Sequence, residues 1–177
     1  MKDQRKSDWV RAALERHESA LQRYATSILG DSERARDIVQ DTFVRLCAED
    51  PARLDGCLAE WLFAVCRNRA LDVLRKEKRM TPLTDMDLEL RASEEPSPAA
   101  VAEKNETASQ ILSLLGALPS NQREAIRLKF QAGLSYAEIS RVTGHSVTNV
   151  GFLIHTGIKT LRQKLQAETN PNLRRVQ

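Results

Sequence analysis

The residues with the clearest potential for acid–base chemistry are two aspartates on one predicted helix. Asp37 and Asp41 lie one helical turn apart beside Gln40, and paired carboxylates can act as general acid and base. That use needs a pocket and a partner that shifts a pKa, and the surrounding sequence offers neither. We therefore interpret these residues as a polar stripe that either meets a protein partner or is a solvated face.

Other catalytic and metal-binding patterns are also missing from the sequence. It contains no glycine-rich phosphate loop, no GxSxG and no HExxH. Cys47, Cys57 and Cys66 lack CxxC spacing and lie far in sequence from the three histidines, which argues against a zinc site. We expect the cysteines to be reduced, small apolar residues on helices. The protein is expected not to be an enzyme and to need no cofactor or metal.

A second kind of chemistry, the recognition of DNA, fits the stretch 134–165. It predicts two helices around a tight turn, a helix-turn-helix whose second helix lies in the major groove. Ser135 and Glu138 form a capping box that starts the first helix. Gly144 can end that helix, and Ser146 can cap the second. The alternative is an ordinary helical hairpin in an all-α core.

The second helix of this motif has little positive charge, since its first basic residue is Lys159. Asn149 can read adenine through a bidentate pair, and Thr148 or Phe152 can touch a thymine methyl. Phe152 could instead pack against the first domain or an inhibitor. The candidate DNA contacts of this motif are Arg141, Ser146, Thr148, Asn149, Phe152, His155, Thr156 and Lys159.

The same helix contains residues that are unusual at such positions. Leu153 and Ile158 can widen its buried face. Gly151 and Gly157 each weaken a helix by roughly 1 kcal/mol relative to alanine. A glycine can instead permit close approach of a neighbouring helix.

A second candidate site is the basic end of a helix predicted at about 58–78. Its arginines and lysines suit phosphate contacts, although they also suit the negative end of a helix dipole. Trp61 is expected to pack in the core, but an aromatic beside a basic helix can also stack on an unpaired base. The candidate residues here are Trp61, Arg67, Asn68, Arg69, Arg75, Lys76 and Arg79.

The elements that position these sites are predicted to be helices throughout. Only 5% of the 177 residues are aromatic and only 7 are glycine, while good helix formers dominate. Residues 1–80 form the first domain, with one helix capped by Ser7 or Asp8 and ended by Gly30, and a second capped by Ser32. A loop around Pro51 and Gly56 leads to the third.

Residues 81–106 carry seven acidic and two basic residues and three of the six prolines, which is typical of a flexible linker. Residues 107–170 form the second domain, with helices near 106–118 and 122–132 ahead of the helix-turn-helix. Residues 171–177 are expected to be a frayed tail. The acidic middle between two basic ends suggests two nucleic-acid-facing modules joined by a segment that resembles a polyanion.

No apolar run approaches the roughly 18 residues that span a membrane. The first residues, MKDQRKSDWVR, lack the apolar core of a secretory signal. The sequence therefore predicts a cytoplasmic protein with no membrane partner.

Three motifs resemble those of bacterial sigma factors of the extracytoplasmic-function type. DIVQDTFVRL (Asp37–Leu46) looks like the helix that binds core RNA polymerase. WLFAVCRNRALDVLRKEKR (Trp61–Arg79) looks like the helix that binds the promoter −10 element. LPSNQREAIRLKFQAGLSYAEISRVTGHS (Leu118–Ser146) looks like the domain that binds the −35 element. The motifs occur in the family's order, with a linker of suitable length between them.

The resemblance implies two small helical domains, like sigma regions 2 and 4, and a role in promoter recognition, melting and initiation. It implies that Asp37, Gln40, Asp41 and Val44 face the clamp-helix region of core polymerase, with Ile38, Val39 and Phe43 mostly in the core. The flap of polymerase and promoter DNA at −10 and −35 are the other implied partners. An anti-sigma factor is left open, as is whether the free protein is compact.

The alternative function is a stand-alone helix-turn-helix regulator whose first domain senses a ligand or dimerises. A third reading is a purely structural helical adaptor. The basic helix at 61–79 favours the sigma factor, since a sensing domain has no need of it.

Overall fold

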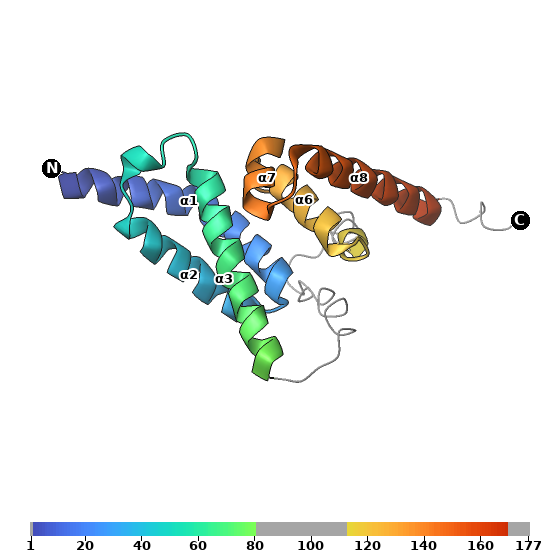
Figure 1. Cartoon of the computed structure of the whole chain (residues 1–177), viewed down its shortest axis with the longest axis horizontal. Helices are drawn as coiled ribbons and strands as arrows, with labels where there is room; N and C mark the ends of the chain where they lie inside the picture. The colour runs from blue at the N-terminus through green and yellow to red at the C-terminus, as the bar shows by residue number, and fades with distance from the viewer. Residues whose placement is uncertain (1, 81–112, 170–177) are drawn as a thin grey trace, which may run out of the picture.

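The computed structural model describes residues 2–80 and 113–169, and all regular structure in these two ranges is helical (Figure 1). The first range contains α1 (Lys2–Leu29), α2 (Ser32–Ala48), the 3₁₀ turn η1 (Pro51–Arg53) and α3 (Leu58–Met80). The second contains α6 (Ser120–Phe130), α7 (Tyr136–Thr143) and α8 (Val147–Thr169). The predicted all-α class is therefore confirmed. The predicted linker 81–106 and the tail 171–177 lie outside the described residues.

Helices α1, α2 and α3 pack around one apolar core. Tyr24 and Leu21 on α1, Leu46 on α2 and Leu62 and Phe63 on α3 are almost completely buried. The rings of Tyr24 and Phe63 meet edge to face, with centroids 5.3 Å apart. This core fixes α3 beside α1 and α2, so that one surface of α3 remains for other contacts.

The start of α1 differs from the sequence prediction. The helix begins at Lys2 and runs through Ser7 and Asp8, so neither residue is its cap. The Gln4 side chain donates a hydrogen bond to Asp8 one turn ahead, which is an interaction that a continuing helix favours. The predicted end is correct, because Gly30 has φ 69° and donates its amide to Thr26.

The cap of α2 is Asp31, one residue before the predicted Ser32. The Asp31 carboxylate accepts hydrogen bonds from the amides of Glu33 and Arg34, at 2.9 and 3.2 Å. Asp31 has an extended backbone, as an N-cap requires, and its negative charge suits the positive end of the helix.

The helix-turn-helix is confirmed, with the predicted caps. Ser135 and Glu138 form a reciprocal capping box at the start of α7, whose hydrogen bonds lower the pKa of Glu138. Gly144 ends α7 with φ 78°, and the Ser146 hydroxyl accepts from the amide of Asn149 at 3.2 Å. Val150, Leu153 and Ile154 are buried, so the expected widening of the apolar face of α8 by Leu153 is correct.

Helix α6 supports this motif from the other side. Leu118 and Pro119 separate it from a short helical stretch at 113–116, the only described part of the helix predicted near 106–118. Ala125, Ile126 and Leu128 are buried as an apolar face implies. Phe130 is instead 64% exposed at the end of the helix.

The three cysteines are free. Cys66 lies in the core of the first three helices, where burial raises the pKa of its thiol to about 12. Cys47 is exposed on α2, and Cys57 lies in the turn before α3 rather than on a helix. Within the described ranges, no helix is long and apolar enough to cross a membrane, and no cluster of His, Cys, Asp and Glu could hold a metal ion.

The two glycines inside α8 have different surroundings. A Cβ on Gly157 would lie 2.6 Å from Cδ1 of Ile126 on α6, whereas a Cβ on Gly151 would meet the Tyr136 ring at 3.7 Å. Gly157 therefore permits the close approach of α8 to α6. Gly151 has ordinary room for a methyl group.

Alanine substitutions at these glycines test the close approach. Both gain the same helix propensity, about 1 kcal/mol, so their difference reports packing alone. We expect Gly157→Ala to be less stable than Gly151→Ala by about 1–3 kcal/mol in urea unfolding, because the buried Ile126 must move in a filled core. Equal stabilities would contradict a tight contact between α6 and α8.

Candidate nucleic-acid and protein interfaces

The four residues predicted to meet a helical partner share the exposed face of α2. Asp37, Gln40, Asp41 and Val44 are all exposed, at the spacing that places them in one row along the helix. The opposite face, which includes Ile38, Val39 and Phe43, is buried as predicted. Val44 is 69% exposed, although burying it would be favourable, and a large exposed apolar side chain within a polar row suits a protein contact.

Asp41 is also tied to the next helix. Its Oδ2 accepts a hydrogen bond from Nη2 of Arg69 on α3 at 2.6 Å. Nε of Arg69 is buried without a hydrogen-bond partner in the described part of the chain. Arg69, a candidate DNA contact, thus has its guanidinium held at α2, the helix with the exposed row that is predicted to meet a partner.

The C-terminal half of α3 presents four of the candidate residues to solvent. Asn68, Arg75, Lys76 and Arg79 are exposed. Arg75 donates to Asp72 at 3.1 Å, a contact between residues three positions apart on one helix. In the same half, Glu77 forms an ion pair with Arg34 of α2, which holds this end of α3 against α2. The exposed ammonium of Lys76 and guanidinium of Arg79, with the remaining donors of Arg75, are suited to phosphate contacts.

Trp61 is half-buried and packs against the apolar core, so the predicted core position is correct. It retains some exposed surface near the start of α3.

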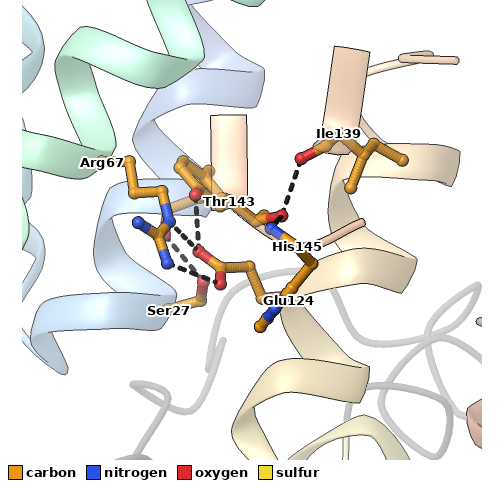
Figure 2. Close-up of polar contacts among 7 residues, drawn as sticks. Ser27, Arg67, Glu124, Ile139, Thr143 and His145 are labelled. Carbon is orange, nitrogen blue, oxygen red and sulfur yellow. Dashed lines mark hydrogen bonds and ion pairs between the residues drawn. The ribbon is translucent and has the colours of Figure 1, made fainter. Parts of the chain in front are cut away.

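Arg67 is placed differently from the other basic candidates, as Figure 2 shows. Its Nε donates to Oε1 of Glu124 on α6 at 2.8 Å, and its Nη2 donates to Oε2 at 3.3 Å. The hydroxyl of Tyr24 donates to Oε1 of the same carboxylate at 2.8 Å. The three side chains come from α1, α3 and α6, so this cluster joins the first three helices to the second group.

Burial and charge shift the pKa values in this cluster. Burial, with the nearby Glu124 carboxylate, raises the pKa of Tyr24 well above its usual value. Burial alone would lower the pKa of Arg67, but its hydrogen bonds and charge pairing with Glu124 raise it. Tyr24 and Arg67 therefore hold their protons and remain donors to Glu124 at neutral pH.

Arg141 on α7 makes a second bridge between the two groups of helices. Its Nε and Nη2 donate to the two oxygens of Glu60 on α3, at 2.8 and 2.7 Å. The hydrogen bond with Glu60 raises the pKa of Arg141. Sequence reasoning missed Glu60 and Glu124, because their partners are 81 and 57 positions away.

The exposed face of α8 contains most of the predicted contacts of the helix-turn-helix. Ser146, Thr148, Phe152, His155 and Lys159 are exposed, while Asn149 and Thr156 are half-buried. Phe152 is 63% exposed, so the alternative in which it packs against the first domain is wrong. The hydroxyl of Ser146 is already engaged as the helix cap.

Two exposed apolar residues near this face escaped the sequence reasoning. Val147, the first residue of α8, is 49% exposed, and Tyr136 at the start of α7 is 40% exposed beside Gly151. The Tyr136 ring lies under the ammonium of Lys129, 5.4 Å from its centroid. The signal that could have identified Val147 is its place directly after a cap, outside the apolar row that begins at Val150.

Comparison with known families matches both groups of helices. Residues 13–80 match the family described as Sigma-70 region 2, and residues 108–161 match Sigma-70, region 4. The chain is 31% identical over 150 residues to the ECF RNA polymerase sigma factor SigM of Bacillus subtilis (strain 168), covering 84% of this chain and 87% of SigM.

Other relatives carry the same description. The ECF sigma factor EcfG of Rhodopseudomonas palustris (strain TIE-1) is 30% identical over 149 residues, covering 84% of this chain and 78% of EcfG. The ECF sigma factor SigE of Mycolicibacterium smegmatis is 29% identical over 154 residues, covering 86% of this chain. This chain spans only 60% of the length of SigE.

Solved structures share the fold. The sigma factor RpoE in complex with the anti-sigma factor NepR from Bartonella quintana aligns with a TM-score of 0.66 at 24% identity, covering 88% of this chain and 96% of RpoE. CnrH in complex with the cytosolic domain of CnrY aligns with a TM-score of 0.57 at 28% identity, covering 89% and 88%. With two family domains in order and two relatives at 30–31% identity over most of both lengths, the chain belongs to the extracytoplasmic-function sigma factors of RNA polymerase.

Proposed function

We propose that this sigma factor divides promoter recognition between its two helical domains. Residues 1–80 bind core RNA polymerase through α2 and the −10 element through α3. Residues 107–170 bind the −35 element through the helix-turn-helix. The observation that carries the proposal is the pair of exposed surfaces on the first domain, the row on α2 that includes Val44 and the basic end of α3.

The stand-alone regulator is not favoured, because residues 13–80, where a sensing domain would lie, match sigma region 2. The family is not known for catalysis, and we expect the chain to act as a specificity subunit rather than as an enzyme. We expect it to act in the cytoplasm, where core polymerase is found. The clamp-helix region and the flap of polymerase are its proposed protein contacts.

At the −10 element, the exposed Arg75, Lys76 and Arg79 suit the phosphates that flank the opened strand. Unstacking a base costs a few kcal/mol, which phosphate contacts and a pocket for the flipped base offset. Arg67 and Arg69 join this set only after they leave the carboxylates that hold them. Trp61, which is only partly buried, is the candidate for stacking.

Promoter-dependent transcription tests the function as a whole. The full chain is mixed with sigma-free core polymerase and a supercoiled promoter library, and transcript starts are mapped. We expect a set of starts that requires the protein, and co-elution of the protein with core polymerase. Absence of both would overturn the proposed function.

The row on α2 is tested by Val44→Lys. Because Val44 contacts solvent, the substitution leaves the core intact, but it places a charge where an apolar contact with polymerase is proposed. We expect affinity for core polymerase to fall roughly ten-fold or more, as for a central interface residue. Ala12→Lys, at an exposed position on α1, is the matched control and is expected to bind normally.

Val44→Lys is preferred to a change at Asp41, since Asp41 also holds Arg69 and its replacement would disturb α3. Helical content by circular dichroism accompanies both variants. If Val44→Lys binds core polymerase as tightly as Ala12→Lys does, α2 does not provide the contact.

Base reading at the −35 element is tested by Asn149→Ala. Loss of a bidentate contact with adenine should cost roughly 1–3 kcal/mol at one base pair and relax the preference there. Gln163→Ala, an exposed amide farther along α8, serves as the control. Binding measured over single-base variants of one promoter gives the answer. An even loss over all variants would make Asn149 a positioning residue instead.

A further inference from the structure

The first turns of α8 present an unusual set of side chains to solvent. Residues 147–156, VTNVGFLIHT, contain no acidic residue, lysine or arginine. Two large apolar side chains are exposed there, Val147 at 49% and Phe152 at 63%. The N-terminal part of the second helix is the part of a helix-turn-helix that contacts base edges. The surface that α8 offers to the bases is therefore largely apolar.

Helical spacing arranges these side chains in two adjacent rows, none of whose members is buried. At four-residue spacing, the rows are Val147, Gly151 and His155, and Thr148, Phe152 and Thr156. The buried face of the same turns is formed by Val150, Leu153 and Ile154. The Phe152 ring is thus directed away from the core, and its removal leaves the core packing unchanged.

This surface lacks the side chains that most often read G·C pairs in the major groove. Guanine is commonly read by the two-pronged hydrogen bonds of arginine or by lysine, and cytosine is read by a carboxylate. None of these groups occurs in residues 147–156. The first cation of the helix, Lys159, lies about 18 Å from Val147 along the axis, at the rise of an α-helix. That position suits a phosphate rather than a base.

An exposed phenylalanine has a natural partner in the major groove, the C5-methyl group of thymine. We propose that Phe152, with the methyl group of Thr148, reads a thymine in the −35 element. Asn149, whose amide can pair with adenine, completes a surface that selects A·T pairs. The inference rests on the proposed function, since it needs α8 to lie in the major groove.

The bare position beside the ring supports this reading. A Cβ on Gly151 would meet the Tyr136 ring at 3.7 Å, which is an ordinary contact, so packing does not require a glycine here. A glycine within a helix is destabilising, but it lets a ligand come close to the backbone. Without a side chain at Gly151, a base edge can approach the helix closely enough to touch Phe152.

Deoxyuridine lacks only the methyl group of thymine, so exchanging the two bases isolates the proposed contact. Holoenzyme is formed from the full chain and core polymerase, and a promoter is taken from the mapped transcript starts. Each thymine of its −35 segment is replaced in turn. We expect one position at which deoxyuridine weakens binding about fourfold, the effect of exposing one buried methyl group. With Phe152→Ala, the same replacement should have no effect. Equal losses with both proteins, or no loss at any thymine, would overturn the inference.

Methylated cytosine gives the converse readout, because 5-methylcytosine places its methyl group where thymine does in the major groove. At the position identified with deoxyuridine, thymine is replaced by cytosine or by 5-methylcytosine. The original chain should bind the methylated duplex more tightly than the unmethylated one, and Phe152→Ala should bind both equally. A preference for the methyl group that survives Phe152→Ala would assign the contact to another residue.

Phe130→Ala is the matched control, since Phe130 is 64% exposed at the end of α6, outside α8. Relative affinities over the duplex set are compared, so any effect on polymerase binding cancels. This variant is expected to keep the full dependence on the thymine methyl group. Circular dichroism establishes that both alanine variants are folded. Loss of the dependence in folded Phe130→Ala would contradict the assignment to Phe152.

Gly151→Arg tests whether this face of α8 meets base edges at all. The position has room for a side chain, and arginine reads guanine. Selection from a promoter with a randomised −35 segment is expected to enrich guanine at one position where the original chain does not. Unchanged selection by a folded variant would mean that this face does not lie against the bases.

Transcription separates this inference from the proposed function. Absence of protein-dependent starts from the unaltered chain would defeat the proposed function. Protein-dependent starts, together with equal binding of thymine and deoxyuridine duplexes at every −35 position, would defeat the reading by Phe152 alone.

Discussion

A carboxylate that is shielded from water between helices must have donors around it, and the position of Glu124 follows from this constraint. Tyr24 and Arg67 supply those donors from α1 and α3, and the apolar residues around them complete the shielding. The register of α6 against the first three helices is thereby fixed, since a shift of one turn would leave the charge unpaired. Helix α7 then lies along α3, and α8 follows through its contact with α6.

The parts of the structure that depend on neighbours in sequence could be predicted from the sequence. Ser135 with Glu138, Gly144 and Ser146 define the ends of α7 and α8 through contacts within three or four residues. The same local reasoning failed where two candidates competed. Asp31 and Ser32 are both good caps, and only the backbone conformation places Asp31 at the cap position.

The sequence could predict which residue types form the candidate site. It could not predict which of those side chains are already bound by other groups of the protein. Arginines on α3 and α7 are predicted to meet phosphates, yet Arg67 and Arg141 are held by acids that lie far away in sequence. No periodicity signals such a partner, because it depends on how two domains meet. Phe152, in contrast to these arginines, remains exposed in the structure. Its ring is not part of the apolar core that α8 shares with the other helices.

Helix α2 serves two neighbours at once. Its exposed row is proposed to meet polymerase, while Asp41 within that row holds Arg69 of the proposed −10 helix. A partner that draws Asp41 toward itself would release a guanidinium a short distance from DNA. Binding of polymerase and binding of the −10 element would then assist one another through one shared carboxylate.

The sparse charge of α8 has a thermodynamic consequence. Counterions released from DNA set how strongly binding depends on ionic strength, and their number follows the phosphates that a surface neutralises. The exposed end of α3 contains Arg75, Lys76 and Arg79, whereas the exposed face of α8 has its first cation at Lys159. In the proposed arrangement a rise in intracellular potassium would weaken the hold on the −10 element more than the hold on the −35 element. The balance between the two promoter elements would then change with the osmotic state of the cell.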